Sequence, residues 1–434
     1  MTTDTLCKRC KKNEAVYVSR KEPFCKECFV RFLRGKQRKQ MAEYKVSYDQ
    51  SLSNLEQQQL SAPRVLLALS LSESSLSLLE MLVSLLHEQR SMHRGRSGFE
   101  LFVIHVDQSE VYPYAEPITT VMDRLQDRFG QSCVIKKTGL NSIFESKFAY
   151  AQQFTHNYLS TSDYVVSDII DPQDHTNNVK DLLSSIRDRT SKLDIIESIR
   201  QRLILQSASD LNCSTILWGD SMTRIAEKTL SLTAKGRGSS LPHQISDTVK
   251  QGISHIYSLR EVLRAETEQY VDLLQISDLV AKPAIAMPNV LRMMTIDDLM
   301  VNYFADIETA FPSIVSTVVR TADKLADPIQ DIASTCFICG VPCEGDQDPG
   351  KWLTDITVNE PATTTATKTV TAASEVNDSP AVIDRTTESL LPSTQRPVLC
   401  YGCLIATKNT SFPWVSLHPR PSKQEILNEF ELHD

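Results

Sequence analysis

The sequence predicts an α/β domain built on a parallel sheet, with a cysteine-rich unit at either end of the chain. Two observations lead to this fold class. Between about residues 62 and 330, short apolar runs alternate with helical patterns, as they do in repeated strand-helix units. Outside that region stand four Cys-x-x-Cys pairs. A chain of 434 residues is long enough for two or three units, since a domain usually takes about 100 to 200 residues.

The first predicted strand is the apolar run 65–70, and leucines at helical intervals follow it over 74–87. A second strand is expected at 99–106. The alternation continues with further strands and helices at 133–137, 214–218, 221–234, 255–259 and 260–274. Parallel strands joined by helices need cover on both faces, so we expect a sheet between two helical layers.

The composition favours a soluble intracellular protein. No run of 18 apolar residues occurs, and the polar N-terminus lacks the apolar stretch of a signal peptide. Cytosolic thiols are kept reduced, so the 11 cysteines indicate metal ligands or free thiols rather than disulfides. We therefore expect a cytoplasmic protein with no membrane span.

The N-terminal cysteines have the spacing of a structural zinc site. Two thiolates three residues apart can reach one ion from a single turn, and a second pair after 14 intervening residues completes a tetrahedron. Four sulfurs leave no open coordination position, so Zn²⁺ would be structural and would supply much of the folding free energy of so small a unit. Four unrelated free thiols are the alternative. The predicted ligands are Cys7, Cys10, Cys25 and Cys28.

The first 40 residues are strongly basic, although the whole chain is acidic. They hold 12 Lys or Arg against 4 Asp or Glu, a balance of +8, and because the chain as a whole carries −8, the remainder carries −16. This asymmetry indicates one end that binds a polyanion; a merely solvated helical face is the alternative. The basic residues are Lys8, Arg9, Lys11, Lys12, Arg20, Lys21 and Lys26, followed by Arg31, Arg34, Lys36, Arg38 and Lys39.

A second four-cysteine site is predicted near the C-terminus. The segment 354–395, rich in Thr, Ser, Ala and Pro without periodicity, would be a disordered insertion between its two cysteine pairs. Closing such a loop costs a few kcal/mol, against about 10 or more from structural zinc. The alternatives are a free cysteine pair, a ligand role for Cys343, or an iron-sulfur cluster, which suits paired knuckles less well than zinc. The predicted ligands are Cys336, Cys339, Cys400 and Cys403.

The turn after the first strand reads Ser70-Leu71-Ser72-Glu73-Ser74-Ser75. PP-loop ATP pyrophosphatases have Ser-Gly-Gly-x-Asp-Ser/Thr there, and the glycines let backbone N–H groups reach phosphate. Here Leu71 and Ser72 fill the glycine positions, and Ser74 fills the aspartate position. We expect Leu71 to stand where backbone should meet phosphate and Glu73 to repel anions. A degenerate nucleotide loop without catalytic residues follows; the plainer interpretation is a turn capped by Ser72 or Ser74.

Two glycine-containing segments follow later. Gly219-Asp220-Ser221 leads into an amphipathic helix, and a cap by Asp220 or Ser221 explains it better than a nucleotide site, with the face formed by Ile225, Thr229 and Leu232 packed on the sheet. Gly236-Arg237-Gly238 is a basic turn that either contacts nucleic-acid phosphate or a partner, or merely ends the helix.

Four stretches together resemble the cytoplasmic tRNA 2-thiolation protein 2 family. They are Cys-Lys-Arg-Cys with Phe-Cys-Lys-Glu-Cys-Phe at the N-terminus, Trp-Gly-Asp-Ser-Met-Thr-Arg-Ile-Ala at 218–226, Lys-Gly-Arg-Gly-Ser-Ser-Leu-Pro at 235–242, and Phe-Pro-Ser-Ile-Val-Ser-Thr-Val-Val-Arg at 311–320 with Asp-Lys-Leu at 323–325. The resemblance spans nearly the whole chain. It implies a PP-loop, adenine nucleotide alpha hydrolase-like domain with a degenerate loop.

The resemblance implies a non-catalytic subunit in a heterodimer with a catalytic PP-loop paralogue. The paralogue would adenylate the C2 oxygen of the wobble uridine, on the way to 5-methoxycarbonylmethyl-2-thiouridine, in the lysine, glutamate and glutamine tRNAs. Sulfur would come from a thiocarboxylated ubiquitin-related modifier, and conjugation of that modifier to proteins is a second associated role. We expect tRNA to be bound by Arg31, Arg34, Lys36, Arg38, Lys39 and Arg237.

Two other functions are weighed against this one. A tRNA sulfurtransferase active on its own through an unorthodox phosphate loop predicts ATP consumption by the isolated chain. A zinc-scaffold ligase of the RING kind needs eight interleaved ligands over a short span, whereas the two sites here lie about 300 residues apart. The predicted units are a zinc unit at 1–32, a basic helical linker at 33–61, the degenerate PP-loop domain at 62–330, and a C-terminal cysteine unit at 331–353 and 396–434 around the insertion.

Overall fold

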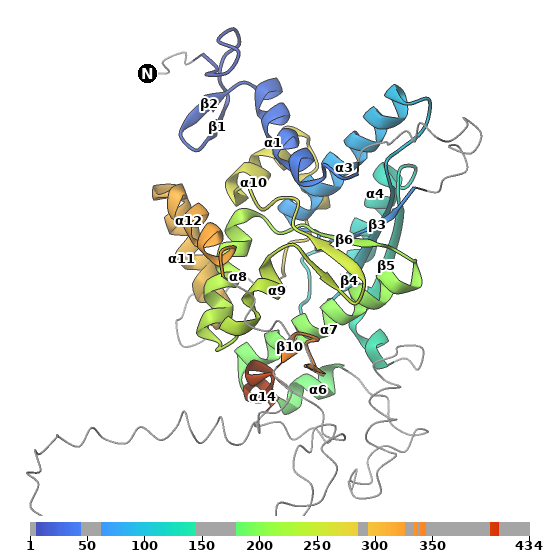
Figure 1. The fold of residues 1–434 in the computed structure, drawn as a ribbon, viewed down its shortest axis with the longest axis vertical. Helices are drawn as coiled ribbons and strands as arrows, with labels where there is room; N and C mark the ends of the chain where they lie inside the picture. The colour runs from blue at the N-terminus through green and yellow to red at the C-terminus, as the bar shows by residue number, and fades with distance from the viewer. Residues whose placement is uncertain are drawn as a thin grey trace, which may run out of the picture.

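A six-stranded sheet forms the centre of the computed structural model, which describes residues 6–44, 62–144, 179–284, 294–325, 334–336, 338–343 and 400–407. The strand order is β5-β4-β3-β6-β8-β7 (Figure 1). All neighbouring pairs are parallel except β7 with β8, so the predicted parallel sheet is confirmed apart from one antiparallel edge. The strands are β3 (Arg64–Ala68), β4 (Glu100–Asp107), β5 (Val134–Gly139), β6 (Thr215–Trp218), β7 (Thr248–Lys250) and β8 (Ile253–Ile256).

Helices cover both faces of the sheet. Alternate residues of β3 point to opposite faces, so that Leu66 joins one buried cluster and Val65 and Leu67 join the other. The first cluster contains α7 (Arg189–Asp210) and α8 (Met222–Ala234). The second contains α3 (Glu73–Met92), α4 (Ile118–Phe129) and α10 (Arg264–Leu273). This is the predicted arrangement of a sheet between two helical layers.

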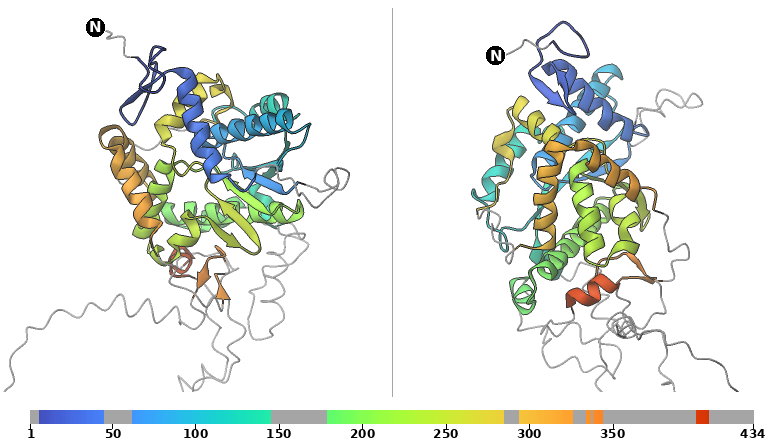
Figure 2. Two further views of the ribbon diagram at one scale, coloured as in Figure 1. Left: turned by 45° about the horizontal axis from the view of Figure 1, so that its top comes forward. Right: turned by 90° about the vertical axis from the view of Figure 1, so that its left-hand side faces the viewer.

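Two further helices pack on the outside of α8. Helices α11 (Ile296–Ala310) and α12 (Pro312–Ala322) follow one another in the chain and contact each other as well as α8 (Figure 2). Thr295 caps α11, and Pro312 occupies the first turn of α12, where its missing N–H costs nothing. The remaining short elements of the domain are η1 (Leu140–Phe144), α6 (Val179–Ser185), η2 (Gly238–Ser240), α9 (Leu241–Ile245) and η3 (Ser277–Leu279).

The two cysteine units lie at opposite ends of the molecule (Figure 1). The N-terminal unit is a hairpin of β1 (Tyr17–Ser19) and β2 (Glu22–Phe24), followed by α1 (Lys26–Gln40), which lies against α3 and α10. The C-terminal unit comprises β9 (Ser334–Thr335), β10 (Pro342–Cys343) and α14 (Tyr401–Thr407). The predicted insertion at 354–395, most of the linker after residue 44, and the segment 408–434 lie outside the described residues.

No described helix combines the length and the apolar character that crossing a membrane requires.

Candidate functional site

The four N-terminal cysteines converge on one point. The Sγ atoms of Cys7, Cys10, Cys25 and Cys28 all lie within 4.8 Å of one another, and those of Cys10 and Cys25 are 3.8 Å apart. Four sulfurs at about 2.3 Å around one tetrahedral ion would stand about 3.8 Å apart. Burial raises the pKa of the Cys7 thiol, but backbone hydrogen bonds from Cys10, Cys25 and Arg9 lower it to about 6. At Cys7 the surroundings therefore favour the thiolate, which is the form that binds metal, whereas burial raises the pKa of the Cys28 thiol to about 12.

Helix α1 carries most of its basic run toward the α/β domain. The guanidinium of Arg34 donates to Glu80 of α3 at 2.9 Å and to the hydroxyl of Tyr270 at 3.0 Å. Lys36 donates to the buried carboxylate of Glu266 at 3.3 Å. Arg38 pairs with Glu88 at 2.5 Å. These three predicted tRNA-binding residues are thus already paired with carboxylates that hold α1 on the domain.

Other cations of the N-terminal unit face solvent. Lys39 lies 3.8 Å from a carboxylate oxygen of Glu261, but its side chain is 74% exposed. Arg31 is exposed and makes no ion pair with any described residue. The same holds for four lysines of the cysteine unit. Arg9 is also exposed and has no ion pair with a described residue, but its guanidinium lies over the rings of Phe24 and Phe32. The other exposed cations of the N-terminal unit that make no ion pair with a described residue are Lys11, Lys12, Lys21, Lys26 and Arg31.

The turn after β3 keeps a backbone conformation that favours glycine. Leu71 has φ of +60°, in the left-handed region that costs an ordinary residue about 1–2 kcal/mol. Its side chain is fully buried in the cluster beneath α3 and α10, and it does not line the pocket. The expectation that Leu71 blocks the place of the phosphate was therefore wrong, because the positive φ turns the side chain into the core.

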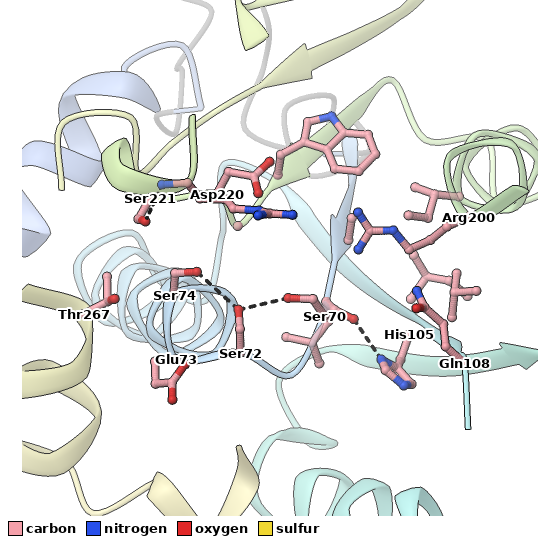
Figure 3. A pocket seen from close by; sticks show the side chains of 18 of the residues that line it. Ser70, Ser72, Glu73, Ser74, His105, Gln108, Arg200, Asp220, Ser221 and Thr267 are labelled. Carbon is pink, nitrogen blue, oxygen red and sulfur yellow. Dashed lines mark hydrogen bonds between the residues drawn. The ribbon is translucent and has the colours of Figure 1, made fainter. Parts of the chain in front are cut away.

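Side chains of the turn bond two of the backbone N–H groups that an anion could otherwise bind. Ser72 caps α3, and its Oγ accepts from the N–H of Ser75 at 3.5 Å. In return, the N–H of Ser72 donates to Ser75 Oγ at 3.1 Å. The hydroxyls of Ser70, Ser72 and Ser74 form a chain across the mouth of the turn (Figure 3). The predicted cap at Ser72 is confirmed, and the N–H groups of Ser72 and Ser75 are both bonded within the turn.

A cavity of about 350 Å³ lies beyond this turn, at the carboxyl ends of β3, β4 and β6. The strand order reverses between β3 and β6, which is where open α/β sheets usually bind ligands. Its three arginines are already paired: Arg200 lies 2.6 Å from Glu197, and Arg224 and Arg264 lie 3.1 Å and 2.5 Å from Glu227. Glu73 also lines the cavity and adds a negative charge. The pocket therefore lies at a usual ligand-binding place of an α/β sheet, but its side chains offer little for phosphate.

The sequence did not reveal two residues of this pocket, Arg200 and His105. Arg200 sits in a helix whose polar residues gave no motif. His105 lies within the predicted strand at 99–106, and its Nδ1 is 2.9 Å from the carbonyl oxygen of Leu69. Burial lowers the pKa of His105, which keeps the ring neutral. Only the position of β4 beside β3 places this imidazole at the cavity.

Gly219 is required by packing. A Cβ at this position would stand 2.7 Å from the Cα of Ser75, so the turn after β6 can approach α3 only as glycine. Ser221 caps α8 through the N–H of Arg224, while Asp220 pairs with Lys228 at 2.7 Å. This agrees with the structural interpretation of the segment, in which Ser221 rather than Asp220 is the cap.

The C-terminal cysteines form a second convergent group. The Sγ atoms of Cys336, Cys339, Cys400 and Cys403 lie within 4.8 Å of one another, and those of Cys339 and Cys400 are 3.6 Å apart. The two pairs therefore meet across the long intervening segment, as predicted. The spacing suits a single tetrahedral ion of about 2.3 Å bond length. The side chain of Cys343, the alternative ligand, lies outside the described residues.

Arg237 lies beside this second group. The residue is 6% exposed, and one terminal nitrogen of its guanidinium lies 3.5 Å from Cys403 Sγ. The other terminal nitrogen donates to Asp194 at 3.0 Å. The prediction that Arg237 contacts tRNA phosphate does not agree with this position, because phosphate could reach the guanidinium only after these contacts broke.

Comparison with known proteins identifies relatives along the full chain. A family model for cytoplasmic tRNA 2-thiolation protein 2 matches residues 295–405. The protein of that name from Debaryomyces hansenii is 36% identical, over 99% of this chain and 96% of its own length. The chain belongs to the cytoplasmic tRNA 2-thiolation protein 2 family. Members from Scheffersomyces stipitis and Yarrowia lipolytica are 36% and 34% identical, and each match covers 100% of this chain.

A solved structure shares the fold of this family member. It is the U34-tRNA thiolase NcsA from Methanococcus maripaludis with its [4Fe-4S] cluster, with a TM-score of 0.53 and 14% identity. The match covers 84% of this chain and 100% of the thiolase. The α/β architecture with a PP-loop thiolase-like sheet is thus confirmed, and family membership connects the chain with tRNA 2-thiolation.

Proposed function

We propose that this chain is the non-catalytic subunit of a heterodimeric tRNA thiolase, with a catalytic PP-loop paralogue as its partner. The observation that carries the proposal is the turn at 70–75, where Ser72 and Ser75 use each other's N–H groups. A phosphate cradle needs those groups free and pointed at the anion. A thiolase fold that has lost its phosphate cradle needs a working copy in another chain.

The electrostatics of the pocket support the same proposal. Bound ATP would bring several negative charges next to Glu73, while Arg200 and Arg224 already neutralise Glu197 and Glu227. Freeing those arginines would leave carboxylates unpaired, which is costly in a partly buried site. The partner would therefore supply ATP binding and adenylation of the C2 oxygen of the wobble uridine.

The N-terminal unit is the proposed tRNA-binding surface. Besides Arg9, which lies over two aromatic rings, five cations there are exposed and lack an ion pair within the described chain, so phosphate contacts would replace only water and counterions. They are Lys11, Lys12, Lys21, Lys26 and Arg31. Lys39 is weakly held and can join them, whereas Arg34, Lys36 and Arg38 position α1 under that surface.

Zinc is the metal that we propose for both cysteine groups. In a four-iron cluster each cysteine binds a different iron, so its ligand sulfurs stand further apart than sulfurs that share one ion. The separations of 3.8 Å and 3.6 Å fit one ion of zinc size. Zn²⁺ bound by four thiolates stabilises the fold and has no open position for chemistry.

The substrate and the sulfur donor follow from family membership rather than from the pocket. The substrates would be the lysine, glutamate and glutamine tRNAs, and the donor would be a thiocarboxylated ubiquitin-related modifier whose conjugation to proteins is an additional role. Thiolation in the cytoplasm is part of the same proposal. The alternative is a sulfurtransferase that works alone.

Turnover of ATP by the purified zinc-loaded chain separates these two functions. The proposal predicts no tRNA-dependent ATP consumption by the chain alone and consumption when the catalytic paralogue is added. Substitution of the partner's own phosphate loop should abolish that activity. Turnover by the isolated chain that Glu73→Lys or Arg200→Gln alters would instead support an independent enzyme.

A further inference from the structure

A buried arginine stands where the α/β domain meets the C-terminal cysteines. The guanidinium of Arg237 bridges Cys403, at 3.5 Å, and Asp194, at 3.0 Å. It also lies 4.0 Å from Cys400 Sγ. Arginine keeps its charge in proteins, and a buried charge needs partners of opposite sign. Sulfur is such a partner only as a thiolate, which is the form that holds a metal ion.

Two glycines allow the contact. Gly236 has φ of +71°, and a Cβ there would stand 2.6 Å from the ring of Tyr401. A Cβ on Gly402 would stand 2.5 Å from the Cγ of Arg237. The turn after α8 and the Cys-Tyr-Gly-Cys segment therefore pack directly on each other, although about 160 residues separate them in the sequence.

The turn is anchored on its other side. Lys235 Nζ donates to Asp194 at 2.8 Å and to Asp297 at 2.5 Å, so the carboxylate of Asp194 serves both Lys235 and Arg237. These contacts join α7, α8 and α11 at one place. A rigid base of this kind can hold a guanidinium in a fixed orientation toward sulfur.

We infer that Arg237 is a positioning residue of the C-terminal metal centre, and that the Lys235-Gly236-Arg237 turn attaches this centre to the α/β domain. The inference rests on the proposed metal occupancy of that centre. A divalent ion with four thiolates carries a charge of about −2, and the guanidinium offsets part of it. Hydrogen bonds to ligand atoms from outside the coordination shell typically change metal affinity by about 10- to 100-fold.

Release of zinc from the full-length protein tests this role. A chromophoric chelator in excess should remove two zinc ions per chain, and the double substitution Cys400→Ser with Cys403→Ser identifies the C-terminal phase because that phase disappears. In Arg237→Gln, the C-terminal phase should be about 10- to 100-fold faster, while the N-terminal phase keeps its rate. Equal acceleration of both phases, or of neither, would overturn the inference.

Two further variants separate a specific effect of Arg237 on the metal centre from general loss of packing or failure to fold. Arg202→Gln is the matched control, because Arg202 donates to the carbonyl oxygens of Cys336 and Ile338 in the same unit, at 3.3 and 3.2 Å. It should accelerate the C-terminal phase much less than Arg237→Gln. Arg237→Lys keeps the charge but loses the two-nitrogen bridge, so it carries the test if the Gln variant does not fold. An unchanged C-terminal phase in the Lys variant would then refute the bridge.

A wild-type chain with only the N-terminal zinc ion would refute the C-terminal centre itself. That result is distinct from a failure of the thiolation proposal, since the chelator assay contains neither tRNA nor ATP.

Discussion

Replacing Leu71 by glycine and by alanine tests the conformation of the degenerate loop. Leu71 is fully buried and has φ of +60°. Truncation of a buried leucine to alanine lowers the free energy of unfolding by about 2–5 kcal/mol. Alanine would still bear the left-handed strain of about 1–2 kcal/mol, which glycine does not.

The comparison between the two variants carries the information. Glycine relieves that strain, but it loses one more buried methyl group, about 0.8 kcal/mol, and has greater unfolded-state entropy, about 0.5–1 kcal/mol. These terms nearly cancel, so Leu71→Gly and Leu71→Ala should be equally stable to within about 1 kcal/mol. Leu67, fully buried in β3 without a positive φ, is the matched control. There glycine should be less stable than alanine by about 1–2 kcal/mol.

Urea unfolding followed by the fluorescence of Trp218, which is buried at the end of β6, measures all four variants. If glycine is as unfavourable relative to alanine at Leu71 as at Leu67, the backbone at Leu71 is not left-handed. The account of the loop as a retained glycine turn with a leucine directed into the core would then be refuted. The Leu71→Gly variant should also fail to bind ATP, because the Ser72 and Ser75 cap remains.

Three further predictions concern other parts of the chain. Changing Lys11, Lys12, Lys21, Lys26 and Arg31 to Gln should weaken tRNA binding and flatten its dependence on salt concentration. Arg34→Gln, which breaks the pair with Glu80, should lower stability but leave the salt dependence unchanged. Equal effects of the two variants on the salt dependence would contradict the proposed surface. Gly219→Ala should destabilise the fold by about 1–3 kcal/mol, because its Cβ would meet the backbone of Ser75. Gly139→Ala, whose Cβ would meet nothing within 4 Å, should be close to neutral. Equal shifts of the melting temperature in the two variants would contradict this. Burial lowers the pKa of His255 to about 3, whereas the pKa in the unfolded chain is about 6.5, so the unfolded state binds more protons between these pH values. The free energy of unfolding of the wild type should therefore fall by up to about 1.4 kcal/mol per pH unit, relative to His255→Gln, as the pH drops from about 6.5 toward 3. Parallel profiles of stability against pH for the two proteins would argue against this.

The alternation of strands and helices could be predicted because it depends on local patterns. The apolar run at 65–70 and the leucines of α3 each show, within a few residues, the hydrophobic pattern of a strand or a helix. The cysteine pairs were equally informative, because ligand geometry fixes their spacing. The antiparallel edge strand β7 was not predicted, since its three residues carry no periodicity and are defined by pairing with β8.

The functional surfaces could not be predicted in the same way, because they depend on contacts between residues that lie far apart in the sequence. The basic run of α1 looked uniform, but Arg38 meets a carboxylate 50 residues away and Lys36 meets one 230 residues away. The turn that contains Arg237 looks exposed and basic in the sequence, but in the structure α14 packs against it and buries the guanidinium. The direction of Leu71 depended on the sign of one backbone angle, which residue type alone does not give.

Thiolation of the wobble uridine in cells that lack this chain tests the central claim most directly. Thiolated tRNAs for lysine, glutamate and glutamine are retarded in gels that contain a mercury compound, because mercury binds the sulfur atom. The account predicts that the retarded species disappears when the chain is deleted and returns when it is restored, even with Glu73→Ala in the unused loop. Normal retardation in the deleted cells would contradict the account.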